Sequence, residues 1–195
     1  MPFQTIIYFI TGVAALVGVV FFEHVHSPRW SVKTLGDAFV VPEIATHTTI
    51  REQRELQPPR AVDGAVLVDE SAARFESERT LYTLTARLVE AQVMEDGDYH
   101  LVLEDPTTGL RLVAEIPDGD APMPTRYAAY CHNARHMIDA LIGQPSRTAM
   151  SPAAPPLIEI TGVGFFDSPH LVVPTGMAPN YREIHPVLIV KAKER

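Results

Sequence analysis

Residues 97–118 read "GDYHLVLEDPTTGLRLVAEIPD", and this stretch decides the fold. Two runs of alternating apolar and polar residues flank the four-residue loop "PTTG", which predicts a β-hairpin. The register follows from the pattern, because a slip of one residue would bury the charged side chains. The pairs that face the core are then Tyr99–Ile116, Leu101–Ala114 and Leu103–Leu112. The outer pairs are His100–Glu115, Val102–Val113 and Glu104–Arg111.

The outer face of this hairpin carries its charges. Two of the three outer pairs are charge-complementary cross-strand neighbours, each contributing about 0.2–1 kcal/mol. Such pairs stabilise a solvated sheet and need no catalytic purpose. We therefore interpret this face as the wet side of a hairpin.

The surrounding pattern predicts a mainly β domain over residues 80–195. Further strands are expected at 80–93, 157–167 and 183–190, and a helix at 125–143 that ends at Gly143. An Asp96-Gly97 dipeptide favours a type I′ turn, and Gly162 and Gly164 suit a sharp bend in the fourth strand. The helix has an apolar face made of Tyr127, Tyr130, Cys131, Ala134, Ile138 and Leu141. Three strands, one helix and two strands indicate a five-stranded Greek-key barrel like that of oligonucleotide/oligosaccharide-binding (OB) domains, with the helix between strands three and four.

The N-terminus predicts a membrane anchor over residues 1–23. No charged residue occurs before Glu23, and the apolar stretch is long enough, at roughly 30 Å of helix, to cross a bilayer. A cleaved signal peptide would have a basic start and a small-x-small cleavage site, and neither is present. The residues expected to anchor the chain are Phe3, Ile6, Ile10, Leu16, Val20 and Phe22.

Residues 24–79 have no clean period, yet they are too apolar for a solvated linker. We expect an extended connecting segment that lies on a partner or on the membrane-proximal face of the domain. The residues expected to contact a partner are Trp30, Phe39, Val40, Val41 and Ile44.

Composition excludes several classes of function. The chain has 195 residues and a formal net charge of -8, so nucleic acid is a poor partner. Its single cysteine, Cys131, excludes an internal disulfide and is expected to be a buried small side chain. Nucleotide-binding loops, a G-x-S-x-G elbow and a C-x-x-C pair are absent from the sequence, and no cofactor is predicted.

Two sets of histidines could serve a site. His132 and His136 have the i, i+4 spacing of zinc ligands, but Asn133 stands where a metalloprotease needs glutamate, so solvated surface residues are expected. The second set flanks the loop between strands four and five, where OB barrels bind ligands. It could bind a divalent metal or exchange protons, or it could form a polar rim fixed by prolines. Its members are Asp167, His170, Glu183 and His185.

Four blocks carry a resemblance: "GDYHLVLEDPTTG", "AEIPD", "TGVGFFDSPH" and "TGMAPNYREIHPVL". Over about residues 80–190 the chain resembles a family of small, uncharacterised bacterial proteins that are exported or membrane-anchored. The resemblance implies an extracytoplasmic OB-like domain without an assigned activity. The sequence departs from the family in the "LVVPTG" loop after His170, which puts a ligand role of that loop in doubt, and in having one cysteine where exported relatives have a pair.

A fainter likeness is to thermonuclease-type OB enzymes. Asp96, Asp98 and Arg111 would there serve calcium and phosphate chemistry. The acidic composition, the expected pairing of Arg111 with Glu104 and the lack of an identifiable catalytic glutamate count against it.

These features together predict a non-catalytic accessory subunit of a multi-subunit membrane complex, with a respiratory or photosynthetic assembly as a plausible host. The alternatives are a metal-dependent hydrolase and a small-ligand or glycan-binding module on the barrel rim. The basic residues Arg29 and Lys33 favour a cytoplasmic domain by the positive-inside rule. The resemblance to exported or membrane-anchored proteins favours a periplasmic domain instead. We expect a single-pass inner-membrane protein with the domain outside the cytoplasm.

Overall fold

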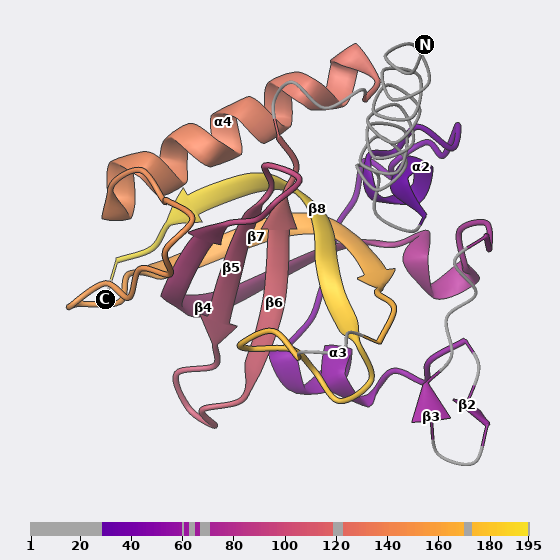
Figure 1. The fold of residues 1–195 in the computed structure, drawn as a ribbon, viewed down its shortest axis with the longest axis horizontal. Coiled ribbons are helices and arrows are strands. Elements are labelled where there is room, and N and C mark those ends of the chain that lie inside the picture. Colours follow the sequence, from indigo (N-terminus) through magenta and orange to yellow (C-terminus); the bar gives the residue numbers. More distant parts are fainter. Residues whose placement is uncertain are drawn as a thin grey trace, which may run out of the picture.

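The barrel is the centre of the structure, a computed structural model that describes residues 29–59, 61–62, 65–66, 71–118, 123–169 and 173–194. The strands curl into a closed ring (Figure 1), and the core cluster of buried apolar side chains lies inside it. Their bounds are β4 Leu81–Val93, β5 Tyr99–Glu104, β6 Arg111–Ile116, β7 Leu157–Phe166 and β8 Arg182–Ala192.

The barrel strands follow the order β4-β5-β6-β8-β7, and pairing of β4 with β7 closes the ring. β6 and β8 are parallel, and the other neighbouring barrel strands are antiparallel. A short strand, β1 (Thr46–His47), adds to β4 in parallel. The mainly β class and the predicted sequence of three strands, a helix and two strands are thus confirmed.

The β5–β6 hairpin has the predicted register in all six pairs, from Tyr99–Ile116 to Glu104–Arg111. The preceding turn differs from the prediction. It spans the five residues 94–98, and only Gly97 of the Asp96-Gly97 dipeptide has a positive φ, of 91°. A type I′ turn needs a positive φ at both residues, so the predicted turn type is wrong.

Helix α4 (Thr125–Ile142) packs on β8 and lies along one side of the barrel (Figure 1). Gly143 follows it with a φ of 83°, as expected of a residue that ends a helix. Cys131 and Ile138 are fully buried, which confirms the apolar face. Tyr130 was expected on that face, but it is 49% exposed because the face is narrower than the pattern suggested.

The predicted bend of the fourth barrel strand occurs where its glycines lie. The register between β7 and β8 shifts at Gly162 and again before Gly164. A Cβ at Gly162 would stand 2.6 Å from the carbonyl oxygen of Pro186, and one at Gly164 would overlap the guanidinium of Arg182. These glycines therefore permit both the bend and the close approach of β8.

Residues 29–56 pack on the barrel and contribute to its core. They contain α2 (Trp30–Lys33) and α3 (Ile50–Glu55), and Leu35 and Ile50 are almost completely buried. Phe39, expected to contact a partner, belongs to this same core. The segment is thus more than the extended connection that the sequence predicts, because its short helices and apolar side chains complete the domain.

Two ion pairs, the first buried and the second partly buried, join the start of this segment to residues 71–79. Arg29 binds Glu78, which lies in the 3-10 helix η1 (Glu76–Glu78), and Arg74 binds Asp37. Between residues 29–56 and residues 71–79, the sequence forms a small separate hairpin of β2 (Ala61–Val62) and β3 (Ala65–Val66).

The predicted anchor, residues 1–23, lies outside the described residues. Among the helices that the structure does describe, none is long and apolar enough to cross a membrane.

Candidate metal centre

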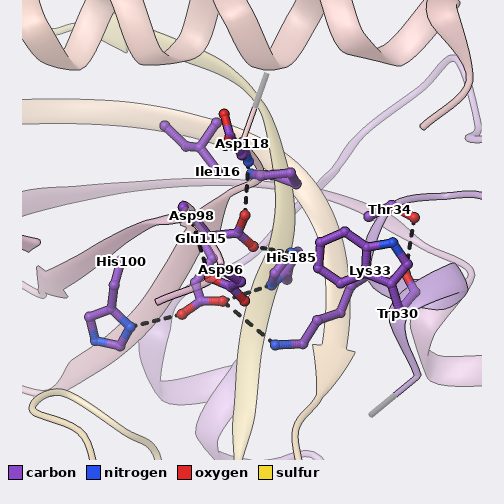
Figure 2. Close-up of polar contacts among 12 residues, drawn as sticks. Trp30, Lys33, Thr34, Asp96, Asp98, His100, Glu115, Ile116, Asp118 and His185 are labelled. Atoms are coloured by element: carbon purple, nitrogen blue, oxygen red, sulfur yellow. Dashed lines mark hydrogen bonds and ion pairs between the residues drawn. The ribbon is translucent and has the colours of Figure 1, made fainter. Parts of the chain in front are cut away.

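A cluster of charged side chains is buried on the outer face of β5, β6 and β8 (Figure 2). His100 comes from β5, Glu115 from β6, and Glu183 and His185 from β8. The pairing of Val113 with Glu183 and of Ala114 with Ile184 places Glu115 next to His185. Because alternate residues of a strand share a face, all four side chains point to the same side of the sheet.

The face is buried because two other parts of the chain cover it. α2 extends Lys33 across it, and the loop before β8 brings the carbonyl oxygen of Thr175 within 3.3 Å of His100 Nε2. Val102 on the same face is fully buried. The prediction that this face is solvated is thus only partly correct. The outer pair Glu104–Arg111 is accessible to solvent, whereas the outer pairs His100–Glu115 and Val102–Val113 are buried.

His185 lies at the centre of the cluster and is fully buried. Its Nδ1 atom lies 3.0 Å from Glu115 Oε2 and 3.3 Å from Glu183 Oε1. Its Nε2 atom lies 3.5 Å from Asp98 Oδ2. The second oxygen of Glu115 contacts His100 Nδ1 at 2.9 Å, so one carboxylate joins both imidazoles.

Asp98 reaches the cluster from the turn between β4 and β5. Its Oδ1 atom accepts a hydrogen bond of 2.8 Å from the backbone N–H of Asp118, which leaves Oδ2 directed at His185. Arg135 of α4 fixes the same turn, since its guanidinium donates to the carbonyl oxygens of Gly97 and Pro117. Helix α4 thus positions Asp98 through the backbone.

Lys33 and His185, together with His100, balance part of the negative charge. Lys33 Nζ lies 3.7 Å from Glu115 Oε2 and 3.9 Å from Asp167 Oδ1. Burial disfavours the ammonium form of Lys33, but the neighbouring carboxylates, Glu115 foremost, raise its pKa above the ordinary value. Burial likewise opposes a charged His185, and its hydrogen bonds to Glu115 and Glu183 raise its pKa to about 10.

The carboxylates respond to burial in different ways. Burial raises the pKa of Asp98 to about 6 although His185 opposes the shift. Burial and the charges of Glu115 and Asp167 raise the pKa of Glu183 to about 7. Glu115 is different, because Lys33 and the two imidazoles outweigh burial and hold its pKa well below the usual range. The cluster thus sets four carboxyl groups, those of Asp98, Glu115, Asp167 and Glu183, against the basic side chains of Lys33, His100 and His185, and burial favours the neutral form of Asp98 and Glu183.

The geometry also fits a metal ion. Asp98, Glu115 and His185 each offer one ligand atom, and these atoms lie within 4.8 Å of one another. Within the described part of the cluster, Asp98 Oδ2 and His185 Nε2 are buried without a hydrogen-bond partner. Two ligands on a tetrahedral ion with bonds of about 2.0–2.1 Å lie about 3.4 Å apart, close to the 3.5 Å observed. The contact of His185 Nδ1 with Glu183, which is not one of these three ligands, is the support that metal-binding histidines usually have.

The predicted rim residues are partly brought together. Glu183 and His185 are in the cluster, Asp167 joins it through Lys33, and His170 lies outside the described residues. His132 and His136 are exposed, as expected of surface residues.

The thermonuclease-like set is not assembled. Arg111 pairs with Glu104 at one end of the hairpin, while Asp98 lies beyond the other end, where Tyr99 pairs with Ile116. Asp98 does belong to the charged cluster, but its partner there is His185 and not Arg111.

Sequence reasoning missed three members of the cluster: Lys33, His100 and Glu115. His100 and Glu115 could have been found, since they share a face with Glu183 and His185 once strands three and five are paired. Lys33 had no such signal, because its place depends on how residues 29–37 pack on the barrel.

Comparison with known proteins finds no family model, no curated sequence and no solved structure that matches the chain.

Proposed function

We propose that the barrel is a metal-binding domain that holds one divalent transition-metal ion with Asp98, Glu115 and His185. The observation that carries this proposal is the pair of buried atoms, Asp98 Oδ2 and His185 Nε2, which face each other at 3.5 Å without hydrogen bonds. Without metal, the protonated His185 and the Asp98 carboxylate form only a long ion pair, and a metal ion that displaces the Nε2 proton would bind both atoms.

The ligand set indicates the class of metal. An imidazole with carboxylates suits zinc and neighbouring first-row ions, whereas calcium takes six to eight oxygen ligands. Three protein ligands leave a fourth position on a tetrahedral ion, as in catalytic zinc sites, but here all three ligand residues are buried, as in closed structural sites. This favours a non-catalytic role over the metal-dependent hydrolase considered from the sequence.

The strand order supports placing the site in an OB-like barrel. In OB domains the face of the second and third strands, with the loops after strands one and four, binds ligands. Here His100 and Glu115 lie on that face, Asp98 lies in the first of these loops and Asp167 begins the second. The proposed metal site thus occupies the ligand-binding region of such a fold.

Zinc binding by the full-length chain tests the proposal. The chain is purified in mild detergent, stripped with a chelator and titrated with Zn²⁺, and bound zinc is measured by elemental mass spectrometry. We expect one ion per chain, and an affinity at least tenfold lower in Asp98→Asn and His185→Gln. Glu104→Gln and His136→Gln are matched controls at accessible positions of β5 and α4 and should bind as the wild type does.

Circular dichroism of each variant shows whether it is folded. The proposal fails if the wild type takes up no zinc. It also fails if folded His185→Gln binds zinc as tightly as His136→Gln does.

A second proposal concerns the place of the domain in the cell. We propose that it is the extracytoplasmic part of a single-pass inner-membrane protein, anchored by residues 1–23, that serves a larger membrane complex as an accessory subunit. The supporting observation is that two of the residues expected to contact a partner, Val40 and Ile44, are 67% and 85% exposed. Trp30 and Val41 are only partly buried.

Native extraction tests this role. The membranes are solubilised in mild detergent, and the proteins that travel with the chain through size separation are identified by mass spectrometry. We expect co-migration at fixed stoichiometry, and its loss in Val40→Asp/Ile44→Asp. Migration of the wild type alone would contradict the accessory role and leave the metal proposal unaffected.

A further inference from the structure

Among the described residues of the cluster, Lys33 alone comes from outside the barrel strands and the loops that join them. It extends from α2 over the sheet, and its ammonium lies 5.4 Å above the ring of Phe165 (Figure 2 shows its approach to Glu115). Its side chain is only 6% exposed. A buried ammonium needs compensation, which here comes from Glu115 and Asp167.

The backbone that carries Lys33 is fixed from both sides. Arg29, immediately before α2, binds Glu78 and the carbonyl oxygen of Phe166. Arg74 donates to the carbonyl oxygen of Val32 and binds Asp37. The ammonium is therefore held against the cluster by the fold itself.

An ion at the proposed metal site would share Glu115 with this ammonium. Two cations a few ångströms apart repel each other strongly when both are shielded from water. Metal binding must therefore either displace the ammonium from Glu115 or accept its repulsion. In both cases Lys33 lowers the affinity of the site.

We propose that Lys33 is an internal counter-cation that competes with the metal ion for Glu115 and so sets the affinity of the site. This inference rests on the proposed metal function and names its regulation. Without metal, the ammonium neutralises part of the carboxylate charge and keeps the empty domain folded. With metal, the divalent ion takes over that task.

This role has a signature that a purely structural lysine lacks. Replacing Lys33 with methionine keeps most of the side-chain volume and removes the charge. The stability of the empty protein should then fall, since the carboxylates lose their partner, while the affinity for metal should rise. A lysine that only packs against Phe165 would not make the two measurements change in opposite directions.

Competition against a chromophoric chelator measures the affinity of the full-length chain for Zn²⁺. We expect at least tenfold tighter binding in Lys33→Met, and wild-type binding in Lys33→Arg, which retains the charge. Lys191→Met removes an exposed lysine that pairs with Glu159 on the barrel surface, and it should also bind as the wild type does. In chelator, Lys33→Met should melt below the wild type, and zinc should raise its melting temperature more.

The outcomes separate the two proposals. Wild-type zinc binding with equal or weaker binding in folded Lys33→Met overturns the role of Lys33 and leaves the metal site standing. No zinc binding in either protein overturns both. If Lys33→Met does not fold even with zinc, the side-chain ¹⁵N resonance of Lys33 in the wild type decides: a zinc-dependent shift supports the competition, and an unchanged resonance in a zinc-loaded protein contradicts it.

Discussion

Replacing Glu78 by glutamine tests whether the segment before the barrel is part of the folded domain. The Glu78 side chain is completely buried, and both of its oxygens bind Arg29. It also accepts hydrogen bonds of 2.8 Å from the backbone N–H groups of Phe75 and Phe166. Glu78 thus links residue 29, the 3-10 helix and the end of β7.

The expected effect follows from what the substitution leaves behind. The Arg29 side chain is only 1% exposed, so without the carboxylate its charge lacks a counter-charge among the described residues. Breaking a buried ion pair from one side typically costs about 3–5 kcal/mol. Its remaining hydrogen bonds to the carbonyl oxygens of Ala72, Ala73 and Phe166 keep the estimate at the lower end of this range, about 3 kcal/mol.

Urea denaturation in the presence of a chelator measures the free energy of unfolding without a contribution from metal. Glu76→Gln is the matched control, since Glu76 lies in the same short helix with its side chain 95% exposed and should change stability little. A loss below about 1 kcal/mol in Glu78→Gln would refute the view that residues 29–37 are an integral part of the domain.

Three further predictions concern other parts of the barrel. Gly164→Ala should destabilise the domain by about 1–3 kcal/mol in the same urea assay, because the added methyl group would overlap the buried guanidinium of Arg182; wild-type stability would show that β8 can move away. Leu35→Ala should cost about 2–5 kcal/mol, because Leu35 is fully buried, whereas Val40→Ala at an exposed position should cost little; equal effects would contradict the packing of this segment. Burial raises the pKa of Cys131 to about 12, so iodoacetamide at neutral pH should label the thiol only after unfolding, and rapid labelling of the native protein would show that the α4–barrel interface opens.

The barrel could be predicted because its strands alternate clearly and its register has one solution that buries no charge. The local pattern of apolar and polar residues predicts all six pairs of the β5–β6 hairpin. It also predicts both ends of α4 to within one residue. The Asp96-Gly97 turn was mistaken because its loop is longer than the dipeptide suggests. The burial of His100 and Glu115 could not be read from the hairpin alone, since it depends on what covers that face.

The packing of residues 29–56 on the barrel also could not be predicted, because it too depends on residues far away in the sequence. Their helices are too short to show a period, and a left-handed φ of 59° at Leu35 interrupts any pattern. Their place is fixed by long-range contacts, such as Arg182 with Gln53 and Arg29 with Glu78. Lys33, which these contacts place against the charged cluster, therefore could not be found by sequence reasoning, although Glu183 and His185 could.

The most direct test of the metal site is an anomalous difference map from crystals of the zinc-loaded protein, recorded at the zinc absorption edge. We predict one strong peak between Asp98 Oδ2 and His185 Nε2, within bonding distance of both. A zinc-loaded protein with its peak elsewhere, for example at the exposed His132 and His136, would contradict the proposed site.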